Sequence, residues 1–187
     1  ANDLGHALNL GFAEISAQNL LSGGTMARLS LPNGTNLDQA MVLLRDTAPS
    51  AIVTPNTIYR HAQSSSTPAP QLGARHNNNA RLRGTLGVID TGVDTSLLRS
   101  DALLSQQAFA SAHAVPREHG AMVTSIAVAH GARVHIADVF GRSTDGALAA
   151  SAERIAAAID WMVANQIAVV NISVEGPNNA VLQEMVR

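Results

Sequence analysis

The sequence predicts an α/β fold with a parallel sheet covered by helices, preceded by a small α+β unit. Short runs rich in Val and Ile alternate with longer segments whose apolar residues recur at helical spacing. The strands are expected at residues 85–89, 133–139 and 167–172, and the helices at 121–129 and 151–165. This alternation indicates β-α-β units, and strands rich in Val and Ile indicate a parallel sheet covered on both faces. Residues 85–187 are therefore predicted to form one β-α-β-α-β half-domain.

Residues 1–61 are predicted to form the separate small domain. Residues 11–18 and 25–31 alternate with period two around Ser-Gly-Gly, which indicates a β-hairpin. Asn36 is suited to cap the helix that follows it, whose apolar residues share one side. A short returning strand is expected at residues 51–53.

Residues 62–84 are predicted to be a flexible linker between the two domains. The segment is rich in Ser, Thr, Pro and Asn and holds too few apolar residues to order itself. It is the natural place for a proteolytic cut.

The composition excludes several classes of function. The 187 residues carry a net charge of −2 without a basic patch, so no nucleic-acid partner is expected. Cysteine is absent, which excludes a thiolate nucleophile or thiolate metal site, and no apolar run is long enough to span a membrane. The first residues, Ala-Asn-Asp, fit a chain trimmed of a secretory signal, so a secreted or periplasmic location is expected.

The motif Val-Ile-Asp-Thr-Gly at residues 88–92 has three interpretations on its own. Asp90 ends a predicted buried strand, where a carboxylate can simply accept hydrogen bonds from turn N–H groups. Aspartic peptidases present a catalytic Asp in the same Asp-Thr-Gly setting, and share a proton between two such residues. A third possibility is the acidic member of a charge-relay site. The helices downstream favour the third interpretation, because retroviral-type aspartic peptidases continue as all-β proteins.

His119 stands at the start of the next predicted helix, 29 residues after Asp90. An imidazole there can serve as a general base near neutral pH. The alternative is an ordinary surface histidine, like those at positions 113, 130 and 135. An Asp at a strand end and a His at a helix start make up two thirds of a charge-relay site.

The third motif, Val-Val-Asn-Ile-Ser-Val-Glu-Gly-Pro at residues 169–177, follows the other two in an order that resembles the subtilisin-like serine peptidases. The resemblance covers about residues 85–180. Residues 1–61 resemble the inhibitory propeptide of that family, ending in a Pro-Asn-x-x-Tyr-Arg segment at 55–60. The resemblance thus implies a zymogen of a secreted peptidase.

By position, the resemblance implies that Asp90 orients the imidazole and that His119 is the general base and acid. It implies that Ser173, Val174 and Glu175 lie along the groove where the backbone of a peptide or protein substrate adds as a strand. Ala121 stands where the family usually has Thr, and Glu175 where it often has Gly. No segment after Asn171 resembles the family's nucleophile motif or oxyanion Asn, so this chain alone is expected to be inactive.

Alternatives remain open at this point. The chain could be a non-catalytic binding or regulatory module of the same fold, or half of an aspartic peptidase that uses Asp90. No cofactor and no metal ligands are expected, apart from calcium held by scattered acids, which are Asp94, Asp101, Asp138 and Asp145. The partner expected for the strand at 167–172 is the remaining C-terminal part of the peptidase domain, or a second copy of the chain.

Overall fold

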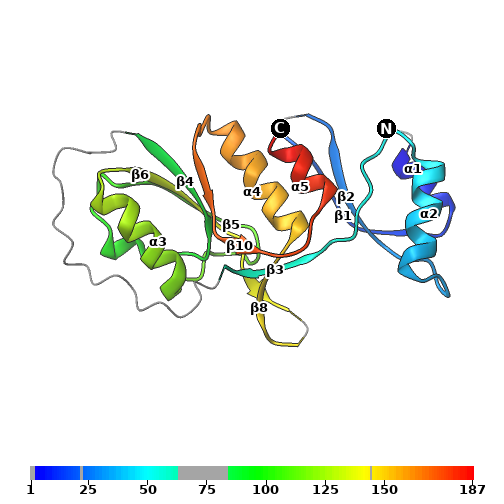
Figure 1. The fold of residues 1–187 in the computed structure, drawn as a ribbon, viewed down its shortest axis with the longest axis horizontal. Helices are drawn as coiled ribbons and strands as arrows, with labels where there is room; N and C mark the ends of the chain where they lie inside the picture. Colours follow the sequence, from blue (N-terminus) through cyan, green and yellow to red (C-terminus); the bar gives the residue numbers. More distant parts are fainter. Residues whose placement is uncertain (1–2, 22, 63–83, 144) are drawn as a thin grey trace.

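A computed structural model describes residues 3–21, 23–62, 84–143 and 145–187 (Figure 1). The predicted linker 62–84 lies outside the described residues except for Ala62 and Gly84. Among the described residues, no helix combines the length and the apolar character needed to cross a membrane.

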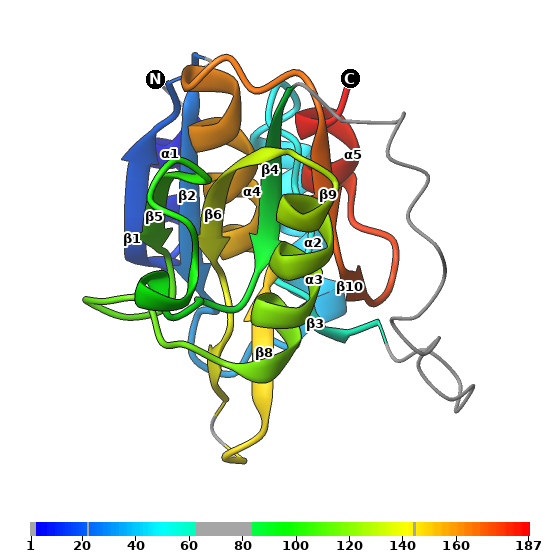
Figure 2. The same cartoon turned by 90° about the vertical axis from the view of Figure 1, so that its left-hand side faces the viewer.

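The centre of the molecule is a four-stranded parallel sheet in the order β5-β6-β4-β9. Its strands are β4 (Thr85–Asp90), β5 (Leu103–Ala108), β6 (Arg133–Asp138) and β9 (Val170–Ile172). Helix α3 (Glu118–Ala129) lies on one face of the sheet and α4 (Ala152–Ala164) on the other (Figure 2). The prediction of an α/β fold with a parallel sheet is confirmed.

Alternate residues of the central strands supply two separate cores. Val88 packs in the cluster under α3, and the next residue, Ile89, packs in the cluster under α4. The same alternation recurs in β6, where Ile136 belongs to the α3 side and Ala137 to the α4 side. All four side chains are fully buried. This explains why successive residues in the second half of each strand are apolar on both faces of the sheet.

Several elements depart from the prediction. Strand β5 was not predicted, because its residues Ser105, Gln106 and Gln107 hide the apolar pattern. The strand predicted at 167–172 is shorter, since Gln166 has a positive φ of 57° and pairing with β4 starts only at Val170. Helix α3 begins at Glu118, three residues before its predicted start, so His119 lies within its first turn.

The N-terminal unit is built from α1 (Asp3–Asn9), β1 (Ala13–Asn19), β2 (Thr25–Ser30) and α2 (Leu37–Thr47). Strands β1 and β2 form the predicted antiparallel hairpin, and Asn36 caps α2 in a reciprocal capping box with Gln39. Helix α1 was not predicted. The hairpin is tied to α4, because Ser16 and Arg28 both bind the Glu153 carboxylate.

The strand predicted at 51–53 is wrong, because those residues form no strand. The strand is instead β3 (Ile58–His61), which belongs to a second sheet in the order β10-β3-β8-β7. Its other members are β7 (Gly141–Arg142), β8 (Leu148–Ser151) and β10 (Val174–Glu175). The end of the predicted first domain therefore pairs with strands from residues 85–187. Helix α5 (Ala180–Met185) packs beside α4 at the end of the chain.

Candidate active site

Asp90 and His119 form a direct pair at the carboxyl end of the parallel sheet. Asp90 is the last residue of β4, and its side chain is completely buried. His119 Nδ1 lies 2.9 Å from Asp90 Oδ1 and 2.8 Å from Oδ2. An ionised carboxylate only accepts hydrogen bonds, so the proton of a neutral His119 belongs on Nδ1. Nε2 then keeps its lone pair and can act as a base.

The residues around the pair explain why it forms. Thr91 Oγ1 accepts a hydrogen bond from the Gly120 N–H at 3.0 Å, which ties the start of α3 to the turn after β4. A Cβ on Gly120 would stand 2.3 Å from the Thr91 carbonyl oxygen. A Cβ on Gly92 would stand 2.9 Å from the Val115 backbone. Gly120 therefore permits the close approach of strand and helix that brings His119 to Asp90, and Gly92 lets the loop before α3 pass close to the turn after β4.

A strand of the same chain runs past this pair. Strand β3 is antiparallel to β8 on one side, pairing Tyr59 with Ala150, and antiparallel to β10 on the other, pairing His61 with Val174. Beyond β3, the Ala62 N–H donates to the Ser173 carbonyl at 3.4 Å. The segment thus joins β10 to β8 and β7 in one sheet, and an extended peptide adds to open strand edges in the same way.

Tyr59 fixes the segment in its groove. Its side chain is 5% exposed and packs in the α4 core, and its hydroxyl donates to the Pro177 carbonyl at 2.6 Å. A Cβ on Gly176 would lie 2.4 Å from Cδ1 of the Tyr59 ring, so the groove has room for the ring only because residue 176 is glycine. Upstream, Asn179 donates from Nδ2 to the Pro55 carbonyl at 3.0 Å.

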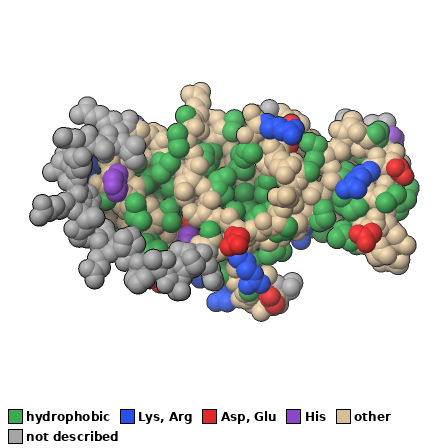
Figure 3. All heavy atoms as spheres, in the orientation of Figure 1, with side chains coloured by type: hydrophobic (Ala, Val, Ile, Leu, Met, Phe, Trp, Pro, Cys, Tyr) green, Lys and Arg blue, Asp and Glu red, His purple; other side chains and the backbone are tan. Residues whose placement is uncertain are grey.

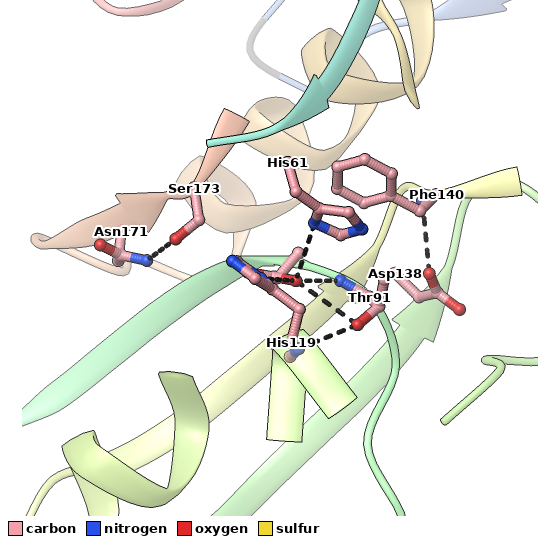
Figure 4. Close-up of polar contacts among 9 residues, drawn as sticks. His61, Thr91, His119, Asp138, Phe140, Asn171 and Ser173 are labelled. Atoms are coloured by element: carbon pink, nitrogen blue, oxygen red, sulfur yellow. Dashed lines mark hydrogen bonds and ion pairs between the residues drawn. The ribbon is translucent and has the colours of Figure 1, made fainter. Parts of the chain in front are cut away.

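His61 places a second imidazole beside the Asp90–His119 pair. Its ring stacks on Phe140 at a centroid distance of 3.8 Å and lies 4.5 Å from the His119 ring (Figure 4). Its Nδ1 is 3.9 Å from Asp90 Oδ1. Burial lowers the pKa of His61, and the nearby His119 acts in the same direction, against the opposing effect of Asp90.

The three residues expected along the groove have different positions. Val174 and Glu175 form β10 and pair with His61 and Arg60. Ser173 precedes them, and its Oγ accepts a hydrogen bond from Asn171 Nδ2 at 2.7 Å. Ser125, the other serine near the motifs, lies exposed on α3 and donates to the Met122 carbonyl.

Each of the four acids considered for calcium interacts with different residues of the chain. Asp94 caps the short helix that follows it, Asp101 pairs with Arg99, and Asp145 binds Ser143. Asp138 accepts hydrogen bonds from the Val115 and Phe140 N–H groups, and burial raises its pKa.

Sequence reasoning missed His61, Phe140 and the Tyr59 pocket as parts of the site. These residues are far from Asp90 along the chain and carry no spacing motif. The one signal in the sequence was the likeness of residues 55–60 to the end of a propeptide. That likeness could have predicted a strand in the groove at these residues.

The fold and site define an α/β protein with a buried Asp–His pair at the carboxyl end of its parallel sheet. Comparison of the sequence with protein-family models gave no match, and comparison with curated proteins gave none.

Proposed function

We propose that these residues carry the Asp–His part of a subtilisin-like serine endopeptidase, held in an inhibited zymogen form by strand β3. The observation that carries the proposal is the coincidence of two features. A buried carboxylate holds the imidazole of His119 by both oxygens, and a peptide strand runs in a groove directly beside them.

The chemistry proposed is acyl transfer. Nε2 of His119 takes the proton of a serine hydroxyl while the serine oxygen attacks the substrate carbonyl carbon, and the imidazolium then gives the proton to the leaving amine. Asp90 keeps the imidazole in the required tautomer and stabilises its charged form. We propose that the serine comes from polypeptide outside these 187 residues, because Ser125 and Ser173 have other hydrogen-bond partners.

In this proposal β3 shows how a peptide or protein substrate would bind. A substrate strand would take the place of residues 58–62 between β8 and β10, with Ser173, Val174 and Glu175 along one side. The same contacts support the second candidate, a non-catalytic binding or regulatory module. The aspartic peptidase alternative has less support, because Asp90 faces the imidazoles of His61 and His119 where that mechanism needs a second carboxylate.

The remaining part of the peptidase domain, or a second copy, is the partner proposed for β9. This strand is the last of the sheet, and Val169 beside it is 60% exposed. Met122 and Ile126 of α3 are also half exposed, so this helix presents apolar side chains that a partner could cover. Apolar side chains are visible along the middle of one broad face (Figure 3). Export to a secreted or periplasmic location belongs to the same proposal.

The decisive experiment compares hydrolysis of a casein substrate by the polypeptide of the complete coding sequence and by its variants. Asp90→Asn should lower kcat by about 10⁴-fold, since it leaves the shape intact but disturbs the tautomer of His119. The matched control is Asp101→Asn, an exposed acid paired only with Arg99 in the described structure, which should keep full activity. Residues 1–187 alone should not react with a fluorophosphonate. Stoichiometric labelling would contradict the proposal and implicate Ser125 or Ser173, and undiminished hydrolysis by Asp90→Asn would refute the role of the pair.

A further inference from the structure

His61 brings a ring nitrogen that makes no hydrogen bond with the described residues close to the Asp90–His119 pair. Its Nδ1 is buried and has no hydrogen-bond partner among the described residues. A buried polar atom without a partner is unfavourable by about 1–3 kcal/mol. Asp90 Oδ1 lies 3.9 Å away, and an oxygen of a carboxylate cannot donate to it. The gap between this nitrogen and the carboxylate is therefore a place for a positively charged group.

Three ligand atoms converge on that place. One atom each from His61, Asp90 and His119 lies within 4.8 Å of the other two. Two imidazole nitrogens and one carboxylate oxygen are ligands that zinc accepts at about 2.0–2.2 Å, which places neighbouring ligands roughly 3.3 Å apart. From one and the same oxygen, Asp90 Oδ1, His119 Nδ1 lies 2.9 Å away and His61 Nδ1 lies 3.9 Å away, so the two distances lie on either side of that value.

The surroundings hold the three ligands in place from independent elements. Asp90 ends β4 and accepts the Thr91 N–H at 2.7 Å, and His119 is fixed by the first turn of α3. The His61 ring lies between His119 and the Phe140 ring on which it stacks (Figure 4). Partners of this kind orient metal ligands. The His61 and His119 side chains are 21% and 27% exposed, so an ion can approach from solvent.

We propose that His61, Asp90 and His119 form a zinc site that exists only while residues 58–62 occupy the groove. The two nitrogen ligands favour zinc over calcium or magnesium, which prefer oxygen. Three protein ligands leave one position of the tetrahedron for water.

Zinc at this point would fasten β3 to the catalytic pair and switch off the base. With the metal on Nδ1 of His119, the single proton of the neutral imidazole moves to Nε2, so Nε2 no longer has a lone pair to accept a serine proton. Removing the ion returns the proton to Nδ1. This regulatory consequence rests on the proposed function, whereas the binding of zinc does not.

The test is a zinc titration of the 187-residue chain in competition with a chromogenic chelator. One equivalent should bind to the native chain, and His61→Ala should weaken binding by at least about 100-fold. Loss of a residue that only orients a metal ligand lowers metal affinity by about 10–100-fold, and loss of a ligand itself should lower it further. The matched control is His113→Ala, which removes an exposed imidazole outside the site and should leave the affinity unchanged. Thermal melts without metal show whether each variant folds like the native chain, and His61→Gln replaces His61→Ala if the latter does not.

Zinc should also shift the NMR signals of the His61 and His119 imidazoles ahead of those of other histidines. No binding by the native chain, equal binding by a folded His61 variant, or an equal loss in His113→Ala would overturn the zinc site. Zinc binding together with a complete polypeptide that fails to hydrolyse peptides would refute the proposed function while leaving the metal site standing.

Discussion

Gly120 of α3 lies so close to Thr91 that a Cβ at position 120 would be 2.6 Å from the Thr91 hydroxyl and 2.3 Å from its carbonyl oxygen. This contact joins the two motifs that were recognised separately in the sequence. The start of the helix approaches the end of the strand closely because position 120 has no side chain, and the Asp90–His119 pair forms as a result.

Gly120→Ala should therefore destabilise the protein and separate the pair. Overpacking of this kind is unfavourable by about 1–3 kcal/mol, although alanine is intrinsically the better helix former. Urea denaturation measures the change in the free energy of unfolding. Gly5→Ala in α1 is the matched control, because a Cβ there meets nothing within 4 Å, and it should be neutral or slightly stabilising. Equal effects of the two substitutions would contradict the close approach.

Tyr59 should account for most of the anchoring of β3. Tyr59→Phe removes the donor to the Pro177 carbonyl and should lower the free energy of unfolding by about 1 kcal/mol. Tyr59→Ala also empties the pocket and should lower it by about 3–5 kcal/mol. Trp161 is the only tryptophan of the chain and reports unfolding by fluorescence. Ile58→Ala, on the exposed neighbouring side chain, should change stability far less. A Tyr59→Ala protein as stable as Ile58→Ala would refute the anchoring role.

The stability of the protein should fall on acidification partly because of His135. Burial lowers the pKa of this imidazole in the folded state, and Arg133 adds to the effect. Below the unfolded pKa of about 6.5 the unfolded chain then binds more protons than the folded one, so stability decreases until the folded pKa is reached. The free energy of unfolding of His135→Gln should depend less steeply on pH in this window than that of the native chain. The pH dependence that comes from the lowered pKa of His61 should remain. Denaturation midpoints between pH 7.5 and 5 measure the difference, and an identical slope would contradict the assignment.

The open edge at β9 should lead to association of the 187-residue chain. Its outer N–H and C=O groups have no neighbouring strand in the described sheet, and exposed apolar side chains such as Val169 lie beside them. Sedimentation at micromolar concentration should show species larger than the 19.4 kDa monomer. Val169→Arg should reduce this association.

The matched control for the edge is Val42→Arg, on an exposed valine of α2 in the N-terminal unit, which should leave association unchanged. A stable monomer of the native chain with a cooperative melt would show that β9 needs no further strand beside it, and would contradict this prediction.

The sequence by itself determined the elements whose evidence is local. Strands β4 and β6 were predicted within one residue of their ends, because their Val and Ile residues stand out without knowledge of the neighbouring strands. Helix α4 was predicted at residues 151–165 and spans Ala152–Ala164, and Ser151 caps it. The sequence also singled out Asp90 and His119, since an Asp at the end of a buried strand and a His at a helix start are each visible within a few residues.

Only the tertiary structure decided what lies next to what. Strand β5 has a polar sequence and becomes a strand because β6 offers it hydrogen-bonding partners. Strand β3 was misplaced to residues 51–53 because its partners, β8 and β10, lie about 90 and 115 residues away along the chain. His61 reaches Asp90 for the same reason. Periodicity records which face of a segment is buried, whereas pairing between distant segments depends on backbone geometry that no local pattern encodes.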